Sequence, residues 1–103
     1  MKIILTRVFV DDQDRALKFY TNVLGFVKKS DVSAEGYRWL TVVAPEDQNG
    51  TELLLELNDN PVVQAYQKGI FEHGIPATSF SVKDIRAEYE RLKEHGVAFT
   101  MEP

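Results

Sequence analysis

The sequence contains no cysteine. Disulfides, thiolate nucleophiles and cysteine-ligated zinc or iron–sulfur centres are therefore excluded. Its apolar runs, such as 3–5 and 53–55, stop after three or four residues, whereas a membrane-spanning helix needs about 20. The N-terminus also lacks the cleavage region of a signal peptide. We expect no membrane partner and a cytoplasmic location.

Positive charge is scarce as well. The chain has 12 Lys and Arg against 16 Asp and Glu, a net charge of −4, and no basic cluster larger than Lys28-Lys29. Proteins that bind nucleic acids usually carry a basic stripe that neutralises phosphates. We therefore expect no nucleic-acid partner.

The remaining composition is that of an ordinary folded domain. The chain has 103 residues, of which 44% are hydrophobic and 27% are charged. At roughly 100–200 residues per domain, this length allows one domain. Such a chain can bury a core, though a modest one.

The first half of the chain alternates strand-like and helix-like patterns. Residues 2–10 alternate as a strand, and Asp12 or Asp14 can cap the helix whose apolar spacing begins at Ala16 and ends before Gly25. Three further strands are predicted at 26–32, 37–43 and 51–57.

The second half begins with a helix and then repeats the earlier order. Asn60 followed by proline predicts a helix from 60 to about 73. A strand at 76–82 follows, then a helix capped by Asp84, and then the start of a strand at 97–101.

The two halves resemble each other in element order. The pattern Val-x-Asp, helix, Gly recurs about 71 residues later, which indicates two copies of one supersecondary unit. We divide the chain into a first module at 1–58, a connecting helix at 60–74 and an incomplete second module at 76–103. Two strands of that second module would lie beyond Pro103, so we expect a truncated form of a protein of about 125 residues.

Glu56 is the most interesting single position. It lies near the end of a predicted strand and shares a face with Glu52 and Leu54. A carboxylate on a concave sheet face can bind a metal or act as a general base when burial raises its pKa. Alternation supports equally a second interpretation, in which the leucines at 53, 55 and 57 form the core and both glutamates face water.

Arg7 and three aromatic residues are further candidates. Arg7 lies between two apolar residues of a strand, where it would meet an anionic ligand or a carboxylate such as Glu56. Trp39, with Tyr37 and Phe9, could stack on a flat ligand, although such aromatics more often belong to the core.

Other catalytic motifs are missing. The two histidines each fall in the last turn of a predicted helix, where a cation complements the helix dipole. There is no metalloprotease motif, phosphate-binding loop or dinucleotide-binding fingerprint. Neither Ser79 nor Ser81 has a neighbouring base that would support a hydrolase triad.

Three segments together resemble a known family. They are VFVDDQDRALKFYTNVLGF at 8–26, GTELLLEL at 50–57 and VKDIRAEYERLKEHGVAF at 82–99. With their spacing they resemble the glyoxalase, bleomycin-resistance and extradiol-dioxygenase group, the vicinal oxygen chelate superfamily. The resemblance implies an α+β fold of paired βαβββ modules that curl around a cavity and are usually completed by dimerisation.

The resemblance also implies where a metal would bind. Catalytic members of the family take ligands from the first and fourth strands of each module. Those positions fall on Leu5, Glu56 and Ala77, with a fourth beyond Pro103. Leucine and alanine cannot ligate a metal, and a stable site needs at least three protein ligands. We expect no cofactor, and a divalent metal only if residues beyond Pro103 supply ligands.

Three functions stay open. The favoured hypothesis is a metal-independent protein that binds a small organic ligand, as a homodimer, in a cavity lined by Leu5, Arg7, Phe9, Trp39, Glu56, Ala77 and Ser79. The first alternative is a metal-dependent lyase, isomerase or dioxygenase of the same family, with a displaced metal site or with Glu56 as its catalytic base. The second is a dimerisation module whose cavity is vestigial.

Overall fold

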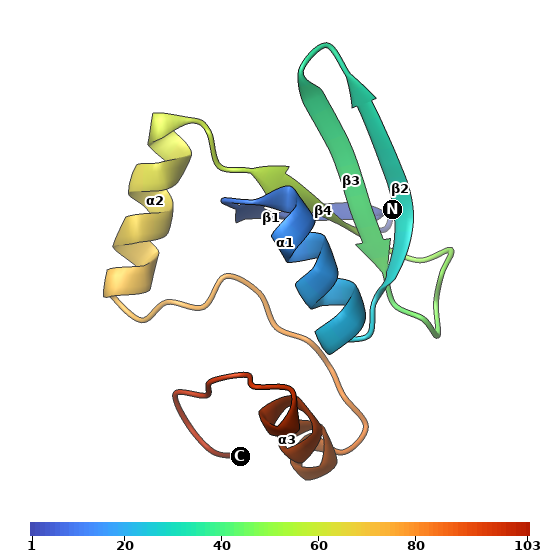
Figure 1. Ribbon diagram of the computed structural model, residues 1–103, viewed down its shortest axis with the longest axis vertical. Helices are drawn as coiled ribbons and strands as arrows, with labels where there is room; N and C mark the ends of the chain where they lie inside the picture. The colour runs from blue at the N-terminus through green and yellow to red at the C-terminus, as the bar shows by residue number, and fades with distance from the viewer.

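A single four-stranded sheet forms the centre of the computed structural model, which describes residues 1–103 (Figure 1). The strands lie in the order β1-β4-β3-β2. The first pairs with the fourth in parallel, and the other neighbours are antiparallel. Their bounds are β1 Leu5–Val10, β2 Val27–Ala34, β3 Tyr37–Val43 and β4 Glu52–Leu57.

Four helical segments surround the sheet or follow it. They are α1 Gln13–Lys18, the π-helical turn η1 Phe19–Val23, α2 Pro61–Glu72 and α3 Ile85–Glu94. The predicted caps are present, since the side chains of Asp12, Asn60 and Asp84 each accept a hydrogen bond from a backbone N–H of the first helical turn. None of these helices has the length and apolar character needed to cross a bilayer.

The core lies between the sheet and the first helix. Leu40, Val42, Leu53 and Leu55 form its buried centre. Half-buried side chains from β1, α1 and η1 close over it, namely Val8, Val10, Ala16, Leu17, Tyr20 and Phe26. This packing confirms that Leu53 and Leu55 belong to the core face, but Leu57 is 39% exposed and does not.

The hairpin between β2 and β3 extends well beyond the rest of the sheet (Figure 1). Its turn places Glu35 and Gly36 at positive φ, as the primed hairpin turns require. The predicted turn at 34–36 is confirmed. The long hairpin brings Tyr37 to the edge of the open face of the sheet.

The two strands predicted in the second half are wrong. Residues 76–82 and 97–101 form no strand, and α3 lies apart from the sheet in Figure 1. An extended segment becomes a strand only when a neighbour satisfies its backbone hydrogen bonds, and neither segment has one here. Their aromatic residues form contacts instead: Phe80 packs on Phe26, with ring centroids 5.3 Å apart, and Phe99 packs on Tyr89 at 4.7 Å.

Candidate ligand-binding site

Helix α1 covers one face of the sheet. The opposite face, called the open face here, has no helix packed on it in this way, although Thr41, Val43 and Leu54 on it are buried. Because side chains alternate along a strand, Leu5, Arg7 and Phe9 lie on the face opposite the helix-covered core. The parallel register places Phe9 beside Glu56 on the neighbouring strand. The open face therefore joins apolar side chains to a carboxylate.

Glu56 is held by two polar neighbours from different strands. Its carboxylate accepts hydrogen bonds from Arg7 Nη1, at 3.2 Å to Oε1 and 3.4 Å to Oε2, and from the Tyr37 hydroxyl at 3.4 Å. The Glu56 side chain is 17% exposed, whereas Arg7 is 49% exposed. Partial burial and then the charge and hydrogen bond of Glu56 raise the pKa of Tyr37. The pairing of Arg7 with Glu56 expected from the sequence is confirmed.

A second charged group fixes the hairpin to α1. Arg38 donates to both carboxylate oxygens of Asp31 at 2.9 Å and to Asp14 Oδ1 at 2.6 Å. The hydrogen bonds with Asp31 and then Asp14 raise the pKa of Arg38, and the same contact with Arg38 lowers the pKa of Asp31. Three of the five N–H groups of Arg38 are therefore used by these two carboxylates.

Gln13 connects two strands at the point where they separate. Strands β3 and β4 pair only through Thr41–Leu54 and Val42–Leu53. Beyond these pairs, the Gln13 side-chain nitrogen donates to the carbonyl of Arg38 at 3.2 Å and to that of Leu55 at 2.9 Å. The amide thus bridges two strands that no longer bond to each other directly.

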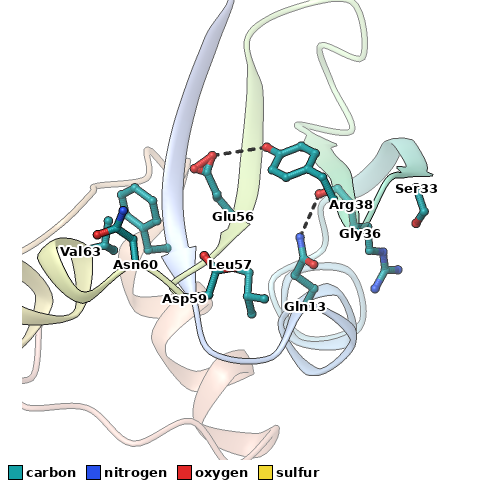
Figure 2. A pocket seen from close by; sticks show the side chains of 11 residues that line it. Gln13, Ser33, Gly36, Arg38, Glu56, Leu57, Asp59, Asn60 and Val63 are labelled. Atoms are coloured by element: carbon teal, nitrogen blue, oxygen red, sulfur yellow. Dashed lines mark hydrogen bonds between the residues drawn. The ribbon is translucent and has the colours of Figure 1, made fainter.

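A hollow of about 560 Å³ lies beside this bridge. In Figure 2, Glu56 has Asn60 and Val63 to one side and Gln13 and Arg38 to the other, and a dashed line marks the hydrogen bond that its carboxylate accepts. The wall combines side chains from strands, helices and loops: Phe9, Gln13, Ser33, Gly36, Tyr37, Arg38, Glu56, Leu57, Asp59, Asn60 and Val63. A volume of this size is typical of small-molecule pockets.

The structure brings together some of the candidate residues and separates others. Phe9 and Glu56 line the hollow. Leu5, Arg7 and Trp39 lie on strands of the same open face, outside its wall. Of the remaining two candidates, Ala77 lies in a second hollow of about 620 Å³ beside α2, and Ser79 is exposed and lines neither.

Sequence reasoning missed the part of the wall that lies outside the strands. Gln13 opens α1, Asp59 and Asn60 follow β4, and Val63 lies in the first turn of α2. The available signal was positional, because the carboxyl ends of the parallel β1 and β4 meet at one edge and the segments that follow them gather there.

Of the positions that the family resemblance assigns to metal ligands, only Glu56 carries a donor within residues 1–103. Leu5 and Ala77 have no side-chain donor atoms, so Glu56, which forms an ion pair with Arg7, is the single donor among them. No group of three or more His, Cys, Asp or Glu side chains is close enough to hold a metal ion. This donor set does not fit a divalent cation.

The chain belongs to the glyoxalase/bleomycin resistance protein/dioxygenase superfamily. The model of that family matches residues 2–103. The uncharacterized protein YurT of Bacillus subtilis (strain 168) is 60% identical over 103 residues, which are all of this chain and 81% of that protein.

Two solved structures extend the comparison. UcmS2 has a TM-score of 0.85 and 32% identity, covering all of this chain and 80% of its own. TnmS3, described as an antibiotic binding protein from Streptomyces sp. CB03234, has a TM-score of 0.63 and 28% identity over 95% of this chain and 73% of its own. The α+β, glyoxalase-like fold class expected from the sequence is confirmed.

Proposed function

We propose that this protein binds a small organic molecule in the hollow beside Glu56 and does not transform it. The observation that carries the proposal is the shape and chemistry of that hollow. Phe9, Leu57 and Val63 supply an apolar wall, and Tyr37 and Glu56 supply a polar end. Such a mixture of apolar area and few polar groups is typical of ligand pockets.

The proposed binding does not use a divalent metal. Of the family metal positions within residues 1–103, Glu56 is the one with a donor, and its carboxylate faces an arginine. The superfamily includes proteins that bind antibiotics, as the description of TnmS3 states. This membership supports binding of a small molecule over metal-dependent chemistry.

We further propose that the protein is a homodimer. The chain exposes 8030 Å², whereas a folded monomer of its mass exposes about 5,900 Å². Its radius of gyration is 14.7 Å, against about 13 Å for a domain of this length. The excess of about 2,100 Å² matches the area that one partner buries in an obligate dimer, but the strands expected beyond Pro103 would cover surface as well, so the solution mass carries the test. Light scattering at micromolar concentration should give twice 11.7 kDa, and a monomer would refute the dimer.

The binding test uses two adjacent valines of α2. Val63 lines the hollow, whereas Val62 is 76% exposed and does not. We expect compounds from a panel of antibiotic-type molecules to raise the melting temperature of the wild type. Val63→Phe should abolish that shift, and Val62→Phe should preserve it. Mass spectrometry of the recovered compound should show an unchanged mass, since turnover would favour the enzyme alternative.

The metal test is a calorimetric titration of Zn, Ni, Mn and Fe(II) into metal-stripped protein. We expect no heat beyond that of Glu56→Ala, because a single carboxylate paired with Arg7 makes a poor site. Tight binding that the variant loses would contradict metal independence. The cytoplasmic location stays a prediction of the sequence, and cell fractionation would test it.

A further inference from the structure

The polar groups of the hollow differ in how many hydrogen-bond donors and acceptors the protein leaves unused. Both Gln13 side-chain N–H groups are used by backbone carbonyls, and its oxygen has no partner within the protein. The Tyr37 hydroxyl donates to Glu56, so its lone pairs remain available. Asp59 has no ion pair or side-chain hydrogen bond and is exposed at the rim. Unused acceptors therefore dominate.

The charged groups of the wall are unbalanced as well, because more negative than positive charge is available to a ligand. Arg38 is the one cation in the wall, and its guanidinium is committed to Asp31 and Asp14. Arg7 offers Glu56 a single nitrogen at 3.2 and 3.4 Å, contacts near the long limit for hydrogen bonds. A carboxylate has about four lone-pair sites, so Glu56 keeps room for a further donor. Besides the two N–H groups that Arg38 has left, the free side-chain donors of the wall, the Asn60 amide and the Ser33 hydroxyl, are neutral.

We infer that the hollow selects molecules that carry a protonated amine or amidine on an apolar body. The cation would lie between Glu56 and Asp59, within reach of the Gln13 oxygen, and the body would lie on Phe9, Leu57 and Val63. The inference rests on the proposed function and adds the charge and hydrogen-bonding character of the ligand. An anionic compound would meet two carboxylates and no free cation.

The test uses three probes that differ only in their polar group: the aminomethyl, hydroxymethyl and carboxylate derivatives of anthracene. Binding is measured by calorimetry at low and high salt. We expect the aminomethyl compound to bind about tenfold more tightly than the hydroxymethyl compound, because one charge-assisted hydrogen bond usually changes a binding constant by about that factor. The carboxylate should bind most weakly, and added salt should narrow the differences.

Two variants connect the preference to the hollow. Glu56→Gln and Asp59→Asn should each reduce the preference for the amine. Asp59 is exposed, so its variant tests the idea even if Glu56→Gln folds poorly. Glu72→Gln changes the same charge at an exposed site outside the wall and should keep the preference.

The outcomes separate the two proposals. Equal or tighter binding of the neutral or anionic probe would overturn the charge preference and leave small-molecule binding intact. Failure of all three probes to bind would overturn the inference about this hollow, and the melting-temperature panel would decide small-molecule binding by itself. Binding of the amine that Val63→Phe leaves unchanged would place the site elsewhere and overturn the inference.

Discussion

The two halves of this chain differ in how many of their residues are buried. All seven buried residues lie between Leu40 and Leu55, within β3 and β4. Beyond residue 57 no residue is buried, and large apolar side chains such as Phe71 and Ile85 remain exposed. The first half thus holds its own core, whereas the second is attached to it at a few points. Local sequence signals suffice to form α2 and α3, but not to give them a core.

Truncation of a core leucine should have the largest effect. Leu55→Ala removes a fully buried side chain and should lower the free energy of unfolding by about 2–5 kcal/mol, measured by urea denaturation. Val62→Ala, at an exposed position of α2, should change it by no more than about 0.5 kcal/mol. If both variants lost the same free energy of unfolding, the proposed difference in packing between the halves would be wrong.

Removal of a helix cap should have a smaller effect on stability than the loss of a core leucine, and it should also differ between the two halves. Asp12 caps the helix that covers the core, and Asp84 caps a helix that lies apart from it. Asp12→Ala should cost about 1 kcal/mol of global stability. Asp84→Ala should instead increase hydrogen exchange within α3 and leave the urea midpoint almost unchanged. A global loss from Asp84→Ala would show that the two halves unfold together.

The aromatic contact between the halves should contribute little to the stability of the sheet and more to the order of residues 76–103. Phe80 meets Phe26 at 5.3 Å and Tyr20 at 6.4 Å between ring centroids. Phe80→Ala should cost about 1 kcal/mol locally and speed proteolysis within 76–103. Strands β1 to β4 should keep their protection. Phe71→Ala, at an exposed residue without such a contact, is the control.

The smallest effect should depend on pH. Hydrogen bonds from Arg38 hold the pKa of Asp31 below its ordinary 3.8. A carboxyl whose pKa is lower in the folded state stabilises the fold above its unfolded pKa and loses that contribution as the pH falls through the folded one. Asp31→Asn should therefore be less stable than wild type at neutral pH. The difference should shrink below about pH 4, as thermal melts at several pH values would show. A difference that grew in acid would contradict this ion pair.

Much of the first half was predictable, because its alternation and caps are local properties. The strands at 37–43 and 51–57, the capped helices and the pairing of Arg7 with Glu56 all followed from residue spacing. The strand-like pattern at 76–82 was equally local, but a strand also needs a hydrogen-bonded neighbour, which no spacing within the segment reveals.

The site was predictable only where it lies on strands. The family resemblance put Phe9 and Glu56, which lie on two different strands, in one cavity, and both line the hollow. Gln13, Asp59 and Val63 come from three separate segments, and only the tertiary arrangement brings them together. Trp39 shows that a position on the correct strand face is not sufficient, because it shares that face with Tyr37 but lies outside the wall of the hollow.

The bridge formed by Gln13 has a consequence for how such a site can diversify. One amide links the diverging ends of β3 and β4 through two backbone carbonyls, those of Arg38 and Leu55, and no core side chain takes part in that link. A shorter or longer side chain at position 13 would let the hairpin swing toward or away from β4, while the core beneath stayed as it is. The aperture and the stability of the fold are thus set by different residues, so a lineage can retune which molecules it accepts without repacking its interior.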